Sequence, residues 1–205
     1  MSTSLLLRAA DFAARRHVDQ YRKGELRVPY VSHPLNVARL ISESAGIDDT
    51  DVLAAAMLHD TLEDTVDTRE EFAALRAAIA LEFGEAVAVL VEEVTDDKWL
   101  EKCERKRLQI EHAPRMSVAA ATIKAADKLC NVRDAVQSPP SDWSLERRIE
   151  YVNHAERVVR SLPAGVPAGL LKVFNEEIDA ARARMRADYL TMTTGYVAAP
   201  QSCFG

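Results

Sequence analysis

A chain of 205 residues with 48% hydrophobic and 28% charged side chains has the composition of one globular domain, which excludes an intrinsically disordered protein. Its net charge of −6 argues against a general nucleic-acid-binding protein. The three cysteines, Cys103, Cys130 and Cys203, are widely spaced without a CxxC pair, which excludes a cysteine-zinc site and indicates a reduced, cytoplasmic protein. No segment resembles a signal peptide or a membrane span, so we expect no membrane partner.

The acidic average hides three basic segments. They are Arg15–Arg27, Lys98–Arg107 and Lys124–Arg133. If these segments meet in the folded chain, an acidic protein carries one cationic pocket suited to phosphate groups.

In chain order the pattern predicts helices almost throughout, with no alternation of strands and helices. Pro34 near the start of one helix, Gly46 after its end and the pair Pro139-Pro140 after a long apolar helix act as boundaries. The sequence predicts an all-α single domain over residues 1–190 and a polar tail over 191–205, a candidate for disorder. One expected helix begins after residues 48–50 and carries residues 58–65. The other expected helices are 4–21, 32–45, 68–83, 85–95, 100–112, 117–137, 143–161 and 167–190.

The segment Leu58–Thr65 holds two vicinal polar pairs, His59-Asp60 and Glu63-Asp64. On one continuous helix, residues four apart share a face, so Glu63 would lie one turn from His59 and Asp64 one turn from Asp60. Four buried polar groups at the end of an apolar helix require a cation or a bound substrate. The alternative is an exposed, solvated helix end.

Two further residues extend this cluster into a possible metal site. His33 stands at a helix start, and Asp127 is a carboxylate among the apolar positions of a long helix. One interpretation of Asp127 is a salt bridge with Lys124 or Lys128. The other joins His33, His59, Asp60 and Asp127 into a two-histidine, two-carboxylate site, a donor set that suits Mn²⁺, Fe²⁺ or Zn²⁺. A carboxylate-rich site with bound water favours Mn²⁺ or Mg²⁺ over a structural Zn²⁺.

The ordered set His33, His59-Asp60 and Asp127 resembles the H…HD…D signature of the HD-domain metal-dependent phosphohydrolases. Longer segments resemble the hydrolase domain of the Rel/Spo alarmone enzymes, and the resemblance covers residues 5–185. Two segments, Val91–Lys98 and Glu104–Leu108, are similar to the stand-alone small alarmone hydrolases in particular. The Rel/Spo-like segments are Phe12–His17, Gln20–Lys23, Pro29–Pro34, Leu58–Thr65 and Lys128–Arg133.

The resemblance implies an HD-type helical bundle and an enzyme of the stringent response. Such an enzyme hydrolyses guanosine 3′,5′-bis(diphosphate), or its pentaphosphate analogue, to GDP or GTP plus pyrophosphate. His33, His59, Asp60 and Asp127 would hold one Mn²⁺ per chain, with other divalent metals as alternatives. Glu63 and Asp64 would orient the attacking water and manage its proton.

The same resemblance implies contacts to the nucleotide. Arg22 and Lys23 are family positions for holding it, although a basic helix end is the plainer interpretation. Asn131 would contact the nucleotide or hydrogen-bond to nearby backbone, and His17 is expected to be structural. Lys98, Arg105 and Lys106 would supply charge to the pyrophosphate, or form a solvated helix face. The chain departs from the family pattern at Cys130 and at Arg27-Val28, which affects the fit around the base.

Two alternatives remain open at this stage. An HD enzyme with the same site could remove the 2′-phosphate of NADPH, as associated with metazoan relatives, or act on another nucleotide. A non-catalytic nucleotide-sensing module is the third possibility. We expect a small-molecule nucleotide as the partner, no nucleic acid, and either a monomer or a homodimer.

Overall fold

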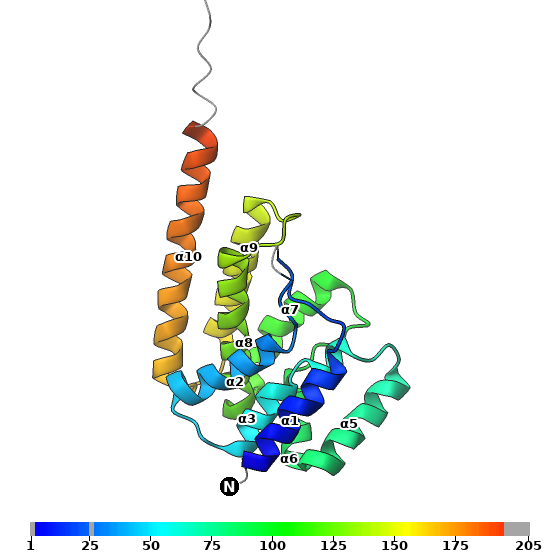
Figure 1. The fold of residues 1–205 in the computed structure, drawn as a ribbon. Helices are drawn as coiled ribbons and strands as arrows, with labels where there is room; N and C mark the ends of the chain where they lie inside the picture. Colours follow the sequence, from blue (N-terminus) through cyan, green and yellow to red (C-terminus); the bar gives the residue numbers. More distant parts are fainter. Residues whose placement is uncertain (1–2, 25–26, 195–205) are drawn as a thin grey trace, which may run out of the picture.

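The computed structural model describes residues 3–24 and 27–194. It confirms the all-α prediction: the described residues form helices and no strand beyond an isolated antiparallel bridge between Tyr21 and Pro29. The helices, shown in Figure 1, are α1 (Thr3–Arg16), α2 (Ser32–Ala45), α3 (Thr50–Leu58), α4 (Thr61–Asp64), α5 (Arg69–Phe83), α6 (Glu85–Val94), α7 (Lys102–His112), the short 3₁₀ helix η1 (Ala113–Arg115), α8 (Val118–Gln137), α9 (Leu145–Ser161) and α10 (Ala168–Thr194).

Several helix boundaries follow from local chemistry. Gly46 ends α2 with φ of 67°, in the left-handed region that glycine adopts without strain. The Asp49 side chain accepts hydrogen bonds from the first amides of α3. Thr68 and Glu71 form a reciprocal capping box at the start of α5.

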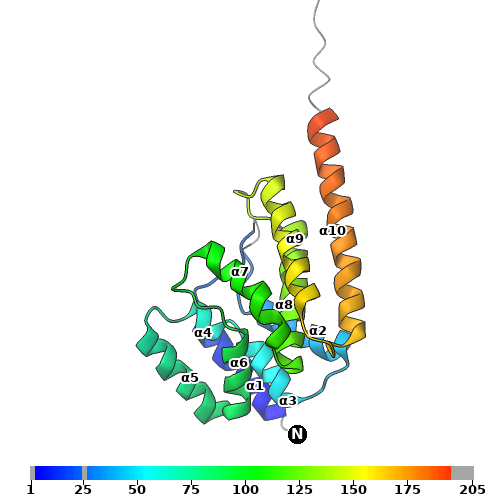
Figure 2. The same ribbon diagram turned by 180° about the vertical axis from the view of Figure 1, so that it is seen from behind.

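The long helix α8 lies at the centre of the fold. It packs against α2, α6, α9 and α10, while α3 packs against α1, α2 and α6 (Figures 1 and 2). Alanines make these close approaches possible: Ala54–Ala56 on α3 and Ala120, Ala121, Ala125 and Ala126 on α8 are fully buried. Charged side chains at the centre of this packing therefore stand in a dense apolar setting, where an unpaired charge is costly.

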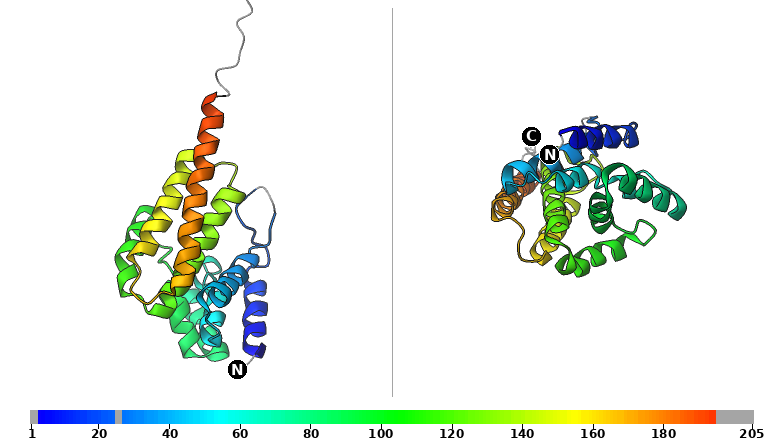
Figure 3. Two further views of the ribbon diagram at one scale, coloured as in Figure 1. Left: turned by 90° about the vertical axis from the view of Figure 1, so that its left-hand side faces the viewer. Right: turned by 90° about the horizontal axis from the view of Figure 1, so that it is seen from below.

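The last helix, α10, runs along α8 and α9, and its C-terminal end extends beyond them (Figure 3, left). Its beginning lies directly on α2, because a Cβ at Gly169 would collide with the backbone carbonyl of Ser44. α10 continues to Thr194, so the first four residues of the expected tail are helical. Residues 195–205 lie outside the described residues, and the division at residue 190 stays a prediction.

Two helical expectations need correction. The first helix ends at Arg16, not near Tyr21, because the chain turns at His17 and then pairs with residues 28–30: the amide of Arg22 donates to Val28 O at 2.9 Å. The expected continuous helix through residues 58–65 is broken. α3 ends at Leu58, and Thr61 opens the short α4, with Thr61 Oγ1 donating to Leu58 O at 2.6 Å. Within the described part of the chain, no helix is both long and apolar enough to cross a bilayer.

Candidate active site

The structure brings the four predicted metal ligands together from three places in the fold. His33 lies in the first turn of α2, His59-Asp60 at the α3–α4 junction, and Asp127 in the middle of α8. Ligand atoms of His33, His59 and Asp60 lie within 4.8 Å of one another. Asp127 Oδ1 lies 3.2 Å from His33 Nε2 and 3.7 Å from His59 Nε2, so it borders the same point.

The orientation of the His59 ring favours a cation. Its Nδ1 lies 2.8 Å from the Ala56 carbonyl, which can only accept, so the proton of neutral His59 is on Nδ1. Its Nε2 then carries a lone pair. This nitrogen is buried, has no hydrogen-bond partner among the described residues, and lies 3.1 Å from Asp60 Oδ2. A lone pair facing carboxylates is repulsive unless a proton or a metal ion lies between them. The donor set and its geometry therefore fit a divalent cation.

The pKa values report the same imbalance of charge. Burial lowers the pKa of His59, but the nearby carboxylates of Asp60 and Asp127 outweigh it and raise the pKa to about 10. Burial would raise the pKa of Asp127, yet the charge of Lys128, the hydrogen bond with His33 and the nearby His59 hold it well below its usual range. A bound divalent cation would replace that proton on His59.

The two oxygens of Asp127 have different surroundings: one forms the predicted ion pair with Lys128, and the ligand role of the other stays a prediction. Oδ1 faces the histidines, while Oδ2 lies 3.3 Å from Lys128 Nζ. Lys124, the other candidate partner, instead donates to Val94 O at 2.9 Å and lies 3.4 Å from Asp96. The salt bridge thus holds Asp127 in place without occupying the oxygen that faces the site.

A second layer of side chains supports the ligands. Tyr30 Oη donates to Asp60 Oδ2 at 2.8 Å, and its ring stacks on His17 with centroids 4.8 Å apart. His17 Nδ1 lies 2.6 Å from Gln20 Oε1, and Gln20 Nε2 donates to the Asp64 carbonyl at 3.0 Å. His17 Nε2 is buried without a hydrogen-bond partner among the described residues, and the structural role of His17 stays a prediction. Tyr30, which the sequence did not single out, fixes the orientation of Asp60.

The two carboxylates that follow the HD pair lie beside the ligands. Burial, together with the charges of Asp96 and Asp60, raises the pKa of Glu63 to about 7. Glu63 accepts from the amide of Asp96 at 3.3 Å and from Arg105 at 3.4 Å. Burial and the charge of Asp60 also raise the pKa of Asp64. A carboxyl group that titrates near neutral pH can take up and release a proton under working conditions.

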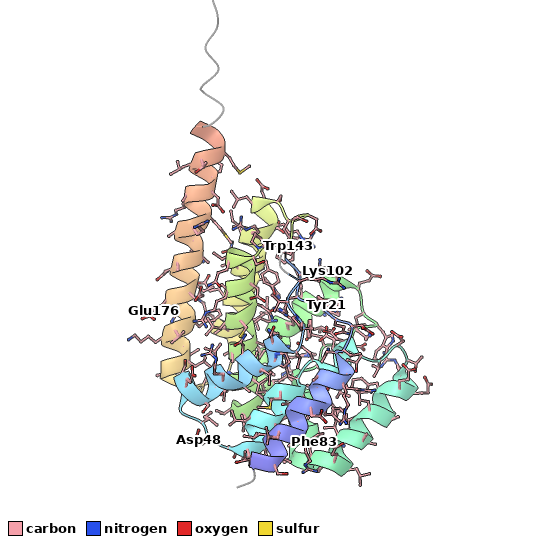
Figure 4. The ribbon with its side chains drawn as sticks, in the orientation of Figure 1. Tyr21, Asp48, Phe83, Lys102, Trp143 and Glu176 are labelled. Atoms are coloured by element: carbon pink, nitrogen blue, oxygen red, sulfur yellow. The ribbon has the colours of Figure 1, made fainter. Side chains whose placement is uncertain are left out.

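These groups open onto a cavity of about 370 Å³. Besides His59, six carboxylates line it: Asp60, Glu63, Asp64, Asp96, Asp127 and Asp134. Four basic side chains from the first and third of the basic segments also line it: Arg22, Lys23, Lys124 and Lys128. The lining also includes four aromatic residues that the sequence did not indicate as functional, Tyr21, Tyr30, Trp143 and Tyr151. In Figure 4 the labelled Tyr21 and Trp143, which both line this cavity, lie on the side of the fold away from Glu176 of α10.

The six predicted nucleotide contacts divide into two groups. Arg22, Lys23 and Asn131 line the cavity. Lys98, Arg105 and Lys106 are not among its described lining residues. Lys98 donates to the Val66 carbonyl, and Arg105 Nη1 lies 3.4 Å from Glu63 Oε1. Both side chains therefore contact protein groups beside the site.

A further cationic group lies close to Lys106. Lys102, labelled in Figure 4, has its pKa lowered by burial and by the charges of Arg147, Lys106, Lys23 and Arg105. The lowered pKa of Lys102 shows that like charges gather in one region. This region joins the second basic segment to Lys23 of the first, as expected for a surface that attracts polyphosphates.

The other two histidines stand outside the ligand cluster. His112 is exposed at the end of α7. His154 is buried, with Nε2 3.0 Å from Gln109 Oε1, and burial with nearby Lys128 and Lys106 lowers its pKa to about 4. Neutral His154 therefore links α9 to α7.

A helical bundle with a His, His-Asp and Asp cluster at its centre is the arrangement of one protein class. The family model described as "HD domain" matches residues 9–155, and the chain belongs to this HD-domain family. The sequence is 52% identical over 159 residues to the Xenopus tropicalis guanosine-3′,5′-bis(diphosphate) 3′-pyrophosphohydrolase MESH1, covering 78% of this chain and 85% of that protein. It is 52% identical over 157 residues to the human protein of the same name, covering 77% of this chain and 84% of the human one.

A solved structure gives the same likeness in three dimensions. It is described as a metazoan ortholog of SpoT that hydrolyses ppGpp and plays a role in starvation responses. The TM-score is 0.80 at 41% sequence identity, with 88% of this chain and 97% of that chain covered. The fold and family predicted from the sequence are therefore confirmed.

Proposed function

We propose that this protein is a Mn²⁺-dependent guanosine-3′,5′-bis(diphosphate) 3′-pyrophosphohydrolase. The observation that carries the proposal is the unpartnered, buried Nε2 of His59 beside His33, Asp60 and Asp127, with Glu63 and Asp64 next to it in one cavity. The names of the similar proteins support the choice of substrate. The donor set of two imidazoles and two carboxylates supports Mn²⁺, with other divalent ions as competitors.

When bound, the metal ion supplies Lewis acidity for the phosphate oxygens and for the attacking water. His33, His59, Asp60 and Asp127 are the residues that would hold it. Glu63 takes up the proton of the water, because its pKa of about 7 lets it be ionised before the step and protonated after it. Arg105, at 3.4 Å, and the amide of Asp96, at 3.3 Å, keep the Glu63 carboxylate in a fixed orientation.

Asp64 has a supporting place in this scheme. Its backbone carbonyl accepts from Gln20 and its amide donates to the Asp60 carbonyl at 2.9 Å, so its position is tied to that of a ligand. Its pKa is raised by burial and by Asp60, so it too can share the proton. The charge of Asp64 in turn contributes to raising the pKa of Glu63.

The basic part of the cavity would hold the nucleotide. Lys23, Lys124 and Lys128 place positive charge along the cavity wall. The aromatic rings of Trp143 and Tyr151 add flat surface to the same cavity, and flat surface suits a purine base. Positive charge for a polyphosphate and aromatic surface for a base, both in one cavity, match a guanosine alarmone.

A product assay tests the proposal. Metal-stripped protein is incubated with guanosine 3′,5′-bis(diphosphate), with and without Mn²⁺, and the products are separated by anion exchange; NADPH is run in parallel. The expected result is GDP plus pyrophosphate only in the presence of Mn²⁺. Release of inorganic phosphate from NADPH alone would keep the site and change the substrate. Binding without turnover of either compound would indicate a nucleotide-sensing module. A cytoplasmic location and the oligomeric state stay predictions.

A further inference from the structure

One ion pair in the cavity wall has no place in the scheme above. Arg22, from the segment between α1 and α2, meets Asp134 of α8: Arg22 Nε donates to Asp134 Oδ2 at 2.7 Å, and Nη2 lies 2.6 Å from the same oxygen. The Arg22 side chain is 16% exposed and that of Asp134 44% exposed, so the pair lies at the boundary between the interior and the cavity. The carboxylate and the charge of Arg22 compensate each other before any ligand binds.

The same guanidinium is connected to the metal ligands. Arg22 Nη2 donates to Asn131 Oδ1 at 2.7 Å, and Asn131 Nδ2 donates to Asp127 Oδ1 at 2.5 Å. Asp127, Asn131 and Asp134 follow one another at i, i+4 and i+7 on the same face of α8. Asn131 can satisfy both neighbours in only one amide orientation, because its oxygen must face Arg22 and its nitrogen must face the carboxylate.

A third contact places the guanidinium over an aromatic ring. The Arg22 Cζ lies 5.3 Å from the centroid of the Tyr30 ring, and Tyr30 donates to Asp60. Arg22 is thus held by Asp134 on one edge, by Asn131 on another and by Tyr30 against its face. A guanidinium held on three sides loses little conformational entropy when a ligand binds to it.

Arg22 and Asp134 also stand between two cavities. Both residues line the active-site cavity and a second cavity of about 500 Å³, on the side of α2, Cys130 and Arg133. Gly24, two residues further on, approaches Ser138 so closely that a Cβ would lie 2.5 Å from Ser138 Oγ. The segment that carries Arg22 is therefore fitted onto the C-terminal end of α8.

We infer that Asp134 is a positioning residue for nucleotide selection: it holds Arg22 as a flat, charge-compensated platform for the nucleobase. This inference rests on the proposed function for the identity of the nucleotide. Asp134 and Asn131 occupy the Nε and Nη2 groups of Arg22, so only Nη1 is left to donate. Arg22 therefore cannot bind a phosphate through two parallel hydrogen bonds. Its open face can stack on a base, while Lys23, Lys124 and Lys128 remain for the phosphates.

Removal of the Asp134 charge releases Arg22 toward the phosphates and opens the wall between the cavities. For Asp134→Asn we expect the KM for the alarmone to rise about tenfold, the loss typical of one charge-assisted hydrogen bond, with kcat and metal content within about twofold. The matched control is Glu177→Gln. Glu177 of α10 accepts a hydrogen bond at 2.8 Å from Arg133, which lies on α8 beside Asp134. Glu177 lines the second cavity and not the active-site cavity, so its replacement should leave KM unchanged.

A double-mutant cycle separates positioning from direct contact. The dissociation constant of GDP, which the enzyme does not consume, is measured calorimetrically for the Mn²⁺-loaded wild type, Arg22→Ala, Asp134→Ala and the double variant. If Asp134 acts through Arg22, the Asp134→Ala change weakens GDP binding about tenfold in the wild type and has no further effect in the Arg22→Ala background. Independent, multiplicative effects of the two substitutions would overturn the inference, as would unchanged GDP affinity in Asp134→Ala.

The cycle remains informative if the proposed function fails. Turnover of the alarmone by wild-type protein tests the function, whereas GDP binding tests the ion pair. Coupling without turnover would reject the function and keep the role of Asp134 in a nucleotide site. Turnover without coupling would keep the function and reject the role of Asp134. Failure of wild-type protein to bind GDP would overturn the inference, because a positioned Arg22 would then hold no base.

Discussion

The two walls of the active-site cavity are built on different principles. The metal-facing wall consists of His33, His59, Asp60 and Asp127, which come from helix starts, helix ends and the middle of α8, and whose side chains are between 2% and 18% exposed. The nucleotide-facing wall comes from the segment between α1 and α2, from α8, and from α9 with the connection that leads into it. Its Asp134 side chain is 44% exposed.

The walls also differ in how their charges are compensated. In the nucleotide-facing wall, Arg22 already has a carboxylate partner, Asp134. In the metal-facing wall, two carboxylates and a histidine lone pair face one another, and a proton or metal ion is needed between them. The metal wall therefore depends on its ligand for electrostatic balance, whereas Arg22 in the nucleotide wall has its charge compensated before a nucleotide binds.

The largest effect is expected at the metal wall. Asp127→Asn removes the negative charge that faces both histidines, and we expect metal content to fall below stoichiometry and kcat to fall by about 10³-fold or more. Metal content is measured by plasma mass spectrometry and kcat by pyrophosphate release. The control is Asp188→Asn, which removes a carboxylate paired with Arg148 far from the cluster. Full metal occupancy in Asp127→Asn would show that the ligand assignment is incorrect.

A smaller loss of activity, with a gain of stability, is expected for Glu63→Gln. The loss of a proton acceptor lowers kcat by about 10²–10⁴-fold while metal stays bound. The folded-state pKa of about 7 exceeds the unfolded value of 4.5, so ionised Glu63 destabilises the fold as pH rises from about 4.5 through 7. Metal-free Glu63→Gln should therefore be more stable than wild type by about 1–3 kcal/mol at pH 8, with no gain at pH 4.

Urea unfolding at the two pH values measures this difference. Glu92→Gln is the control, because Glu92 is a half-exposed carboxylate on the neighbouring α6 that pairs with Arg76. A stability gain that persisted at pH 4 would mean that titration of Glu63 is not its cause. An unaltered kcat would remove Glu63 from the proton-transfer step.

A moderate effect is expected from salt on the nucleotide wall. The positive charges of Lys23 and Lys106 contribute to lowering the pKa of Lys102, and a polyphosphate would relieve that repulsion. Raising the ionic strength from 0.05 to about 0.5 M should increase KM several-fold and change kcat by less than about twofold, because exposed charges are screened. Lys102→Gln should reduce the salt dependence of KM. An equal salt effect on kcat would indicate that salt acts on the metal wall instead.

The smallest effect is expected at Cys130, which lies between Asp127 and Asp134 on α8 and lines the second cavity. Burial and the charges of Asp127 and Asp134 raise the pKa of the Cys130 thiol to about 12, whereas Cys103 is exposed. At pH 8 iodoacetamide should modify Cys103 and leave Cys130 unmodified over the same time, since only the thiolate reacts. Peptide mass spectrometry gives the extent at each site. Comparable labelling of Cys130 would show that the wall opens in solution.

The sequence predicted the helices where local chemistry decides them. Pro34, Gly46, Asp49 and Thr68 stand at helix ends in the structure, and each has a backbone or capping reason to do so. The break at His59-Asp60 was missed because an unbroken apolar pattern favours one long helix. There the Thr61 hydroxyl and the His59 ring bond to the last carbonyls of α3, and this competition with helix propagation is invisible in hydrophobic periodicity.

The metal-facing cluster could be predicted because its residue types are rare in buried positions. The tertiary partners could not. Tyr30 on Asp60, Asp134 on Arg22 and Arg105 on Glu63 each join residues more than 25 positions apart, and no spacing rule links such pairs. Lys98 illustrates the same limit, because its contact with the Val66 carbonyl depends on where the α4–α5 connection lies.

The central claim is that a single cation resolves the charge conflict between His59 Nε2 and the facing carboxylates. Anomalous diffraction from crystals grown with Mn²⁺, collected at the manganese edge, tests this most directly. We predict one peak per chain, within coordination distance of His33, His59, Asp60 and Asp127. A peak elsewhere, or a manganese-free cluster in which a protonated His59 still lies against Asp60, would contradict the account.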